Sequence, residues 1–200
     1  MTMIDPYLSI VENIKNGTNF SFSRFGDGEM FCSQGKKGMN CDHHEYFPDL
    51  GKALRNVLDH PRGIMGLMDK AKPLLKRDIE WVSGRAFCDA SIRGELSLFT
   101  DVLKDRNVVF VGPKHLRKLP FYNFYREVLV HNAWLMHEDL LSALKYVIKK
   151  DDVVIYCCGM MAEVLIHELY DVRFTQIDCG AVFDPYCGVD SRKYHKDLKI

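Results

Sequence analysis

The chain has 200 residues, of which 47% are hydrophobic, which is enough to bury one sizeable core but too short for two large ones. We therefore predict a single domain over residues 1–200. Lysine plus arginine and aspartate plus glutamate both total 27, so no overall positive field attracts DNA or RNA, and we expect no nucleic-acid partner. Any negatively charged ligand must be held by local groups.

Membrane and secretion signals are absent from the sequence. No apolar run approaches the roughly 20 residues that a membrane-spanning helix requires. The start, MTMIDPYLSIVENI, lacks the basic region and the apolar stretch of a signal peptide. The seven cysteines are an odd number and form no Cys-X-X-Cys pair, which argues against a disulfide framework. We expect a soluble, cytoplasmic protein without a membrane span, and the sequence leaves open whether it forms a homo-oligomer.

Short apolar runs alternate with amphipathic stretches along the chain, a pattern typical of an α/β domain. In chain order, strands are predicted at 20–25, 64–67, 86–88, 108–111, 127–130, 153–157 and 174–179. Helices are predicted where apolar residues recur at helical spacing, around 50–58, 140–148 and 162–169.

The arrangement of these elements predicts the fold class. The continuous apolar run VVFV at 108–111 is typical of a sheet that is covered on both faces. The pattern over 153–179 is strand, glycine turn, helix, strand, which predicts a parallel βαβ unit with a right-handed crossover. We therefore predict an α/β fold, a single Rossmann-like domain with a mostly parallel sheet and helices on both faces. The strand order does not follow from the sequence.

The segment SRFGDGE has the chemistry of a diphosphate and metal site. Strand alternation turns Arg24 to the side of the aromatic residues before it, where its guanidinium requires a phosphate or a carboxylate as partner. Asp27 and Glu29 lie two residues apart across Gly28, close enough for both carboxylates to face one hard cation. Gly26 and Gly28 would allow a close approach of the backbone. Asp-Gly is also a common turn signal and Glu29 also suits a helix's first turn, so these residues alone leave a plain turn open.

Two further segments place polar groups after buried strands, where ligands of open α/β sheets collect. The run CCGMMA joins a strand to a helix at Gly159 and Met160, where backbone N–H groups suit a phosphate. Gly112 and Lys114 follow another strand, and His115 beside them is a candidate base or phosphate contact. The alternatives are an ordinary strand-to-helix turn and an exposed loop histidine.

The last predicted strand runs into Asp178 and Gly180. Asp178 is a candidate for contacting ribose or acceptor hydroxyls or for acting as a base, and its alternative role is to cap the loop. Asp184 is a further candidate base, although aspartate before Pro185 is a usual turn opener. Among Asp178, His115 and Asp184, the sequence ranks no base first.

Taken together, these segments resemble the GT-D-type glycosyltransferases, a family with a Rossmann-like fold and an Asp-X-Glu metal motif near its beginning. The resemblance runs in order through FSFSRFGDGE, FVGPKHL, HNAW, VIYCCGMMAEVLIHELY and TQIDCGAVFDPY, and SRFGDGE is its most specific part. It implies Mn²⁺ or Mg²⁺ on Asp27 and Glu29, with Arg24 at the diphosphate. It also implies the family's glycine turn at Gly159 and its Ile-Asp-X-Gly strand end at Asp178. The run AVFDPYCG departs from the family and leaves the donor sugar and the acceptor unassigned.

The leading hypothesis is a metal-dependent transferase that moves a sugar from a nucleoside-diphosphate sugar to a hydroxyl of a glycan or another acceptor. A metal that bridges the phosphates would neutralise charge on the departing diphosphate. The catalytic candidates are Asp27, Glu29, Asp178 and His115. One alternative is a Rossmann-type methyltransferase. The βα turn and the strand-end carboxylate of this chain support it, but the chain lacks the Gly-rich first loop of that class. The other is a non-catalytic nucleotide or sugar-phosphate binding module, in which Arg24 and Asp27 serve affinity only.

Overall fold

The structure is a computed structural model that describes residues 5–74 and 79–197. Within these residues, seven parallel strands form one sheet in the order β3-β2-β1-β7-β6-β4-β5. The strands are β1 (Ser21–Phe25), β2 (Ile64–Leu67), β3 (Trp81–Ser83), β4 (Val108–Pro113), β5 (Phe124–Val128), β6 (Val153–Tyr156) and β7 (Thr175–Asp178). The predicted α/β class with a parallel sheet is confirmed.

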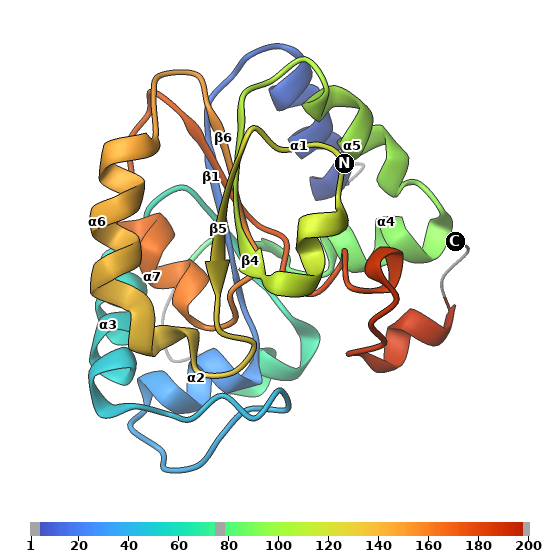
Figure 1. Cartoon of the computed structure of the whole chain (residues 1–200). Helices are drawn as coiled ribbons and strands as arrows, with labels where there is room; N and C mark the ends of the chain where they lie inside the picture. Colours follow the sequence, from blue (N-terminus) through green and yellow to red (C-terminus); the bar gives the residue numbers. More distant parts are fainter. Residues whose placement is uncertain (1–4, 75–78, 198–200) are drawn as a thin grey trace.

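Helices cover both faces of this sheet, as predicted (Figure 1). One layer consists of α2 (Asp27–Ser33), α3 (Pro48–Asp59), α6 (His137–Val147) and α7 (Met161–Glu168). The opposite layer consists of α1 (Pro6–Lys15), α4 (Ala86–Arg93) and α5 (Leu96–Leu103). The connections contain short 3₁₀ helices at η1 (Asp69–Leu74), η2 (Lys114–Lys118), η3 (Ala133–Met136), η4 (Pro185–Cys187) and η5 (Lys193–Asp197). None of the helices described here is long and apolar enough to cross a membrane.

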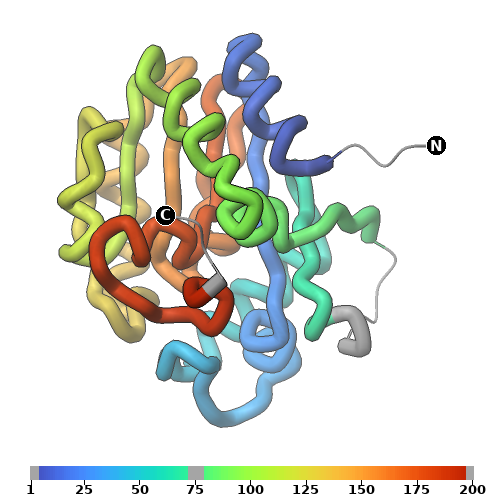
Figure 2. Tube along the Cα trace, turned by 90° about the vertical axis from the view of Figure 1, so that its right-hand side faces the viewer, coloured from blue at the N-terminus to red at the C-terminus, as the bar shows by residue number. Residues whose placement is uncertain are grey.

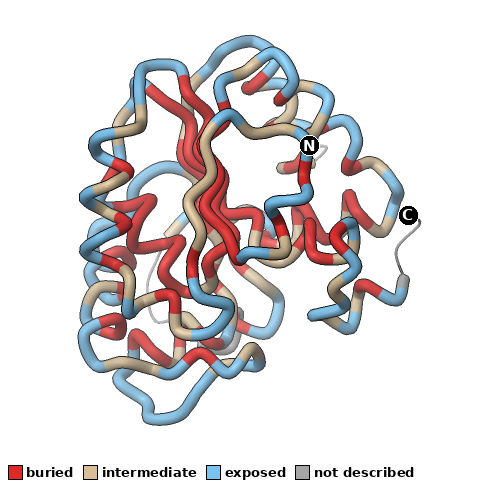
Figure 3. The backbone as a smooth tube through the Cα atoms, viewed as in Figure 1, coloured by how far each residue is buried: buried red, intermediate tan, exposed pale blue. Residues whose placement is uncertain are grey.

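Strand β4 shows why a run of apolar residues without alternation forms the centre of the sheet. Val108 and Phe110 pack into the core beneath α1, α4 and α5. Val109 and Val111 point to the other side and pack with α6 and α7. All four are at most 1% exposed, so each face of the strand is covered (Figure 3). Because both faces are buried, an apolar residue is required at every position.

The prediction of a strand at 86–88 was wrong, because α4 begins at Ala86. Phe87 and Ala90, three residues apart, both pack into the core, which is helical rather than strand spacing. A short apolar run cannot distinguish the two periods. The strand of this region is β3, only three residues long and half-exposed, so its sequence signal is weak. The edge strand β5 begins at Phe124, three residues before the predicted start at 127.

Strands β6 and β7 and the intervening α7 form the predicted parallel βαβ unit, in which Tyr156 is paired with Asp178. Because all seven strands are parallel, their carboxyl ends share one edge, the lower edge in Figure 1. The chain leaves β6 toward β7 but leaves β4 in the other direction, toward β5. The two connections therefore diverge between β6 and β4, the position at which open α/β sheets form a ligand crevice.

Loops from distant parts of the sequence meet along this edge. The backbone N–H of Glu45, in the loop between α2 and α3, donates to Asn132 Oδ1 at 2.7 Å. In the same loop, Asp42 forms an ion pair with Arg192 of the C-terminal segment. Figure 2 shows that segment in red, above the blue loop that follows α2. The carboxyl edge of the sheet is thus bordered by two long connections that hold each other in place.

Candidate functional site

Arg24 and Asp178 form an ion pair across the neighbouring strands β1 and β7. Arg24 Nε donates to Asp178 Oδ2 at 2.8 Å, and Arg24 Nη2 donates to Oδ1 at 3.3 Å. The side chains are 13% and 4% exposed. Burial lowers the pKa of Arg24, but the Asp178 carboxylate outweighs it and holds that pKa well above its usual value. The partner that the sequence required for Arg24 is therefore a carboxylate of the protein itself.

Gly180 completes this pair from the backbone. Its N–H donates to Asp178 Oδ1 at 2.8 Å, so both carboxylate oxygens of Asp178 accept hydrogen bonds. Gly180 has a φ of +55°, in the left-handed region that favours glycine. A Cβ at this position would overlap Arg24 Nη2. The Asp-Cys-Gly sequence is thus needed for the turn and for the space that the guanidinium occupies.

We expect Gly180→Ala to destabilise the protein by at least about 2 kcal/mol, because the left-handed strain and the displacement of Arg24 add. The matched control is Gly188→Ala. Gly188 also has a positive φ, +78°, but an added Cβ would have no neighbour within 4 Å. The control should lose only about 1 kcal/mol, the strain alone. Urea unfolding of both variants measures the difference, and equal losses would contradict the proposed clash.

Asp27 and Glu29 lie at the start of α2, directly after β1. Asp27 is exposed, whereas Glu29 is partly buried and its Oε2 accepts the N–H of Gly26 at 2.8 Å. Burial raises the pKa of Glu29, and the hydrogen bond from Gly26 opposes that rise. The first-turn role that the sequence left open for Glu29 is therefore present, as a cap of the helix.

Glu29 and Asp27 both act electrostatically on a third group, Tyr46. Residues two apart do not share a helix face, but Glu29 folds back toward Gly26 and so brings its carboxylate to the helix start. Burial raises the pKa of Tyr46 to about 12, with further contributions from Glu29 and Asp27.

These oxygens fit a hard divalent cation such as Mg²⁺ or Mn²⁺, which prefers carboxylate ligands. Asp27 is open to solvent, and a carboxylate that accepts one hydrogen bond retains lone pairs for a metal. Over residues 5–74 and 79–197, no group of three or more His, Cys, Asp or Glu side chains is arranged to hold a metal ion. A cation at Asp27 and Glu29 would therefore need further oxygen ligands from its substrate or from water.

Glu163 is a buried acid that the sequence did not single out. It lies in the first turn of α7, is 2% exposed, and its Oε2 has no hydrogen-bond partner within the described part of the chain. Burial raises its pKa well above the usual value, and the carboxylates of Asp178 and Glu29 raise it further. The sequence signal for a buried acid was its position in the apolar run after Gly159. A charged residue is rare among apolar residues that a helix buries.

We expect Glu163→Gln to stabilise the protein at pH 8 and to have a much smaller effect at pH 4. Because its pKa is raised in the folded protein, Glu163 ionises at a lower pH in the unfolded chain than in the folded one. Its cost is therefore absent below about 4.5, the unfolded value, and grows as pH rises toward the folded pKa. The measurement is the free energy of unfolding against pH, with the exposed Glu80→Gln as control. A gain that does not depend on pH would contradict this explanation.

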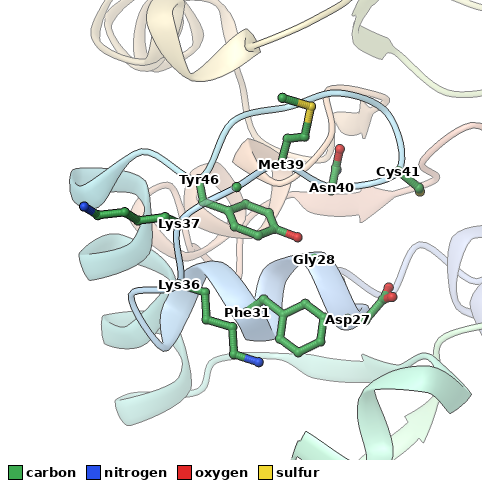
Figure 4. A pocket seen from close by; sticks show the side chains of 10 residues that line it. Asp27, Gly28, Phe31, Lys36, Lys37, Met39, Asn40, Cys41 and Tyr46 are labelled. Carbon is green, nitrogen blue, oxygen red and sulfur yellow. The ribbon is translucent and has the colours of Figure 1, made fainter.

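A pocket of about 290 Å³ lies beside Asp27, between α2 and the loop that follows it (Figure 4). Its lining combines two lysines with two aromatic rings, and these residues are Lys36, Lys37, Phe31 and Tyr46. The Lys36 ammonium lies 3.7 Å from the centre of the Phe31 ring, a cation–π contact. Positive charge, aromatic surface and one carboxylate are therefore gathered in one opening. The sequence does not predict a pocket in this loop, because its lining residues have no regular spacing.

The glycines predicted at the other strand ends have different surroundings. Gly159 has a φ of +64°, and the His44 ring occupies the space that a side chain there would need. Met160 is buried, and its sulfur lies 3.7 Å from the position of a Cβ on Gly28. The turn after β6 therefore packs directly against the start of α2, which joins two of the predicted site segments.

The end of β4 carries Gly112, Lys114 and His115. Gly112 is buried, and a Cβ there would press on Phe110, so this glycine has a packing role. Lys114 is exposed. His115 Nε2 is hydrogen-bonded to Asp184 Oδ1 at 2.8 Å. The structure thus pairs two of the three candidate bases with each other, and the third, Asp178, with Arg24.

Solved structures with this architecture include domains with distant sequences. One, described as a selenomethionine-substituted structure of domain of unknown function 1792, is 15% identical, covers 90% of this chain and 78% of its own, and gives a TM-score of 0.68. A second, described as that highly conserved domain with a distinct glycosyltransferase fold, is 16% identical with the same coverage and TM-score. The fold is a glycosyltransferase fold. A third, described as a new glycosyltransferase from Streptococcus sanguinis, is 16% identical and gives a TM-score of 0.67. The match covers 94% of this chain and 85% of that one.

The glycosyltransferase fold agrees with the GT-D resemblance that the motifs indicated. No protein-family model and no curated protein matches the sequence. At 15–16% identity the solved structures show the fold alone. The roles of individual residues therefore depend on the geometry described above.

Proposed function

We propose that this protein is a metal-dependent glycosyltransferase that moves a sugar from a nucleoside-diphosphate sugar to a hydroxyl of a glycan or another acceptor. The observation that carries the proposal is the pair of carboxylates, Asp27 and Glu29, at the carboxyl end of β1 in a glycosyltransferase fold. Mn²⁺ or Mg²⁺ held by these two residues would supply positive charge to the departing diphosphate. The buried Arg24 and Asp178 pair beside them gives this edge a fixed electrostatic environment.

The pocket beside Asp27 is the proposed position of the donor nucleotide. Lys36 and Lys37 supply local positive charge for phosphates in a protein without net charge. Phe31 and Tyr46 offer ring faces on which a base can stack. The diphosphate would then lie between the lysines and the acids of α2, with its sugar directed along the sheet edge toward β6 and β4.

We also propose that the protein is located in the cytoplasm, as the sequence predicts. The cysteines at the seven positions are free, and six of them are buried. Free buried thiols support a reducing compartment, the cytoplasm.

Calorimetry with UDP and with GDP, each with and without Mn²⁺, tests the proposal. We expect binding only in the presence of the metal, together with release of free diphosphate when a panel of nucleotide sugars is incubated with the protein and Mn²⁺. Metal-independent binding of S-adenosylmethionine would favour the methyltransferase alternative and overturn the proposal. Nucleotide binding without diphosphate release from any donor would favour a binding module.

A further inference from the structure

His115 and Asp184 form a hydrogen-bonded pair at the carboxyl edge of the sheet. The two atoms, His115 Nε2 and Asp184 Oδ1, are 2.8 Å apart, and the side chains are 21% and 10% exposed. The other carboxylate oxygen of Asp184 accepts a hydrogen bond from the hydroxyl of Ser191. Asp184 is therefore held from both sides, and it fixes the orientation of the imidazole.

The direction of this hydrogen bond determines which nitrogen of His115 is available. A carboxylate only accepts, so Nε2 carries a proton in this contact, and in the neutral tautomer with that arrangement the lone pair lies on Nδ1. Within the described ranges, no hydrogen bond to Nδ1 is formed, and the side chain is partly open to solvent. A neutral imidazole with a carboxylate behind it is the arrangement in which histidine accepts protons as a general base.

The hydrogen bonds of the three candidate bases separate them. Both oxygens of Asp178 are engaged, by Arg24 and by the N–H of Gly180. Both oxygens of Asp184 are engaged as well, by His115 and Ser191. His115 alone among the three has an acceptor atom that no residue of the described chain uses.

The end of β4, which carries His115, lies two strand spacings from the end of β7 and three from the end of β1, where the donor site is proposed. Strand β6 separates β4 from β7, and adjacent strands lie about 4.8 Å apart, so the ends of β4 and β7 are about 10 Å apart. His115 lies at the point where the connections after β6 and β4 diverge. The segment from Asp178 to Asp184 spans this distance, since Asp184 meets His115 at its far end.

We propose that His115, oriented by Asp184, is the base that activates the acceptor hydroxyl, and that the sugar is transferred in one displacement with inversion. This inference rests on the proposed function. The acceptor proton passes to His115 Nδ1 as the acceptor oxygen bonds to the anomeric carbon. The bond from that carbon to the diphosphate oxygen breaks, and its electron pair leaves with the diphosphate. Asp184 is a positioning residue that acts through His115.

The test uses the full chain with Mn²⁺ and the nucleotide sugar that gives the fastest diphosphate release. Methanol is the acceptor, because the methyl glycoside that forms keeps its anomeric configuration. We expect His115→Gln to lower kcat by 10²- to 10⁴-fold while the affinity for the nucleoside diphosphate with Mn²⁺ is unchanged. Imidazole added to His115→Gly should restore part of the rate. The methyl glycoside should have the inverted configuration by NMR.

Asp184 is tested against a second histidine–carboxylate pair, His137 with Glu168, whose atoms Nε2 and Oε2 are 2.8 Å apart. We expect Asp184→Asn to lower kcat at least tenfold with little change in KM, and Asp184→Glu to restore part of the loss. Glu168→Gln should stay within a few-fold of wild type, because it changes only the His137 pair. A wild-type kcat in His115→Gln, or a product of retained configuration, would overturn the inference. If instead the proposed function itself is wrong, the wild-type protein releases no diphosphate, so the two failures can be distinguished.

Discussion

Asp27→Asn should lower sugar transfer at least a hundredfold and abolish Mn²⁺-dependent nucleotide binding, while unfolding changes by less than about 1 kcal/mol. Removing one group that stabilises transition-state charge costs about 10²- to 10³-fold in rate. The stability change is small because Asp27 is exposed and contributes only an acid in the first turn of α2. Steady-state kinetics, calorimetry and urea unfolding of the same variant measure the three quantities.

The second acid requires a different substitution, because Glu29 also caps α2. Glu29→Gln retains an oxygen that can accept the Gly26 N–H but removes the charge, so it separates metal binding from the cap. Glu29→Ala would remove both and cost about 0.5–2 kcal/mol in addition. We therefore expect Glu29→Gln to lose metal-dependent binding and to keep the fold.

Asp49→Asn is the matched control for Asp27→Asn. Asp49 is also an exposed acid in the first turn of a helix, α3, and among the described residues it pairs with the exposed Lys52. This variant should bind and transfer like wild type. If Asp27→Asn and Asp49→Asn behave alike, the carboxylate of Asp27 has no special role and the metal site lies elsewhere.

Arg24→Met is expected to destabilise the fold by about 3–5 kcal/mol, because it leaves the Asp178 carboxylate buried without its ionic partner. Replacing both members, as Arg24→Met with Asp178→Leu, should recover part of this loss, since a buried pair can often be exchanged for apolar groups. Guanidinium chloride unfolding of the two single variants and the double variant measures the coupling.

The surface pair of Lys52 and Asp49 provides the comparison. These side chains are 77% and 80% exposed, so Lys52→Met should cost at most about 1 kcal/mol. A loss for Arg24→Met as small as that of Lys52→Met would mean that water reaches the Arg24 and Asp178 pair. The buried pair would then contribute to ligand binding rather than to stability.

The start of α2 shows that two alternatives in the sequence are compatible. A plain helix start and a ligand site were opposed hypotheses for Asp27 and Glu29. In the structure, Glu29 serves the helix through its hydrogen bond with Gly26, and Asp27 remains exposed beside the pocket. The same short segment can therefore begin a helix and present a free carboxylate.

The sequence determined those features that depend on neighbours in the chain. The apolar run of β4 required a sheet covered on both faces, and the pattern over 153–179 required a parallel βαβ unit. Local spacing also predicted the burial of Leu50 and Leu54 on α3. It failed for Ala86 to Cys88, because an apolar run of that length fits a strand and a helix equally well.

Only the tertiary structure decided which groups meet. Arg24 and Asp178 are 154 residues apart in sequence, and His115 and Asp184 are 69 apart, so no local pattern links them. The strand order brings β1 beside β7, and the return of the chain after β7 carries Asp184 to the end of β4. Hydrogen-bond partners follow from this packing, and among the described residues none is bonded to Nδ1 of His115. The sequence supplied the chemical groups, and long-range packing selected their partners.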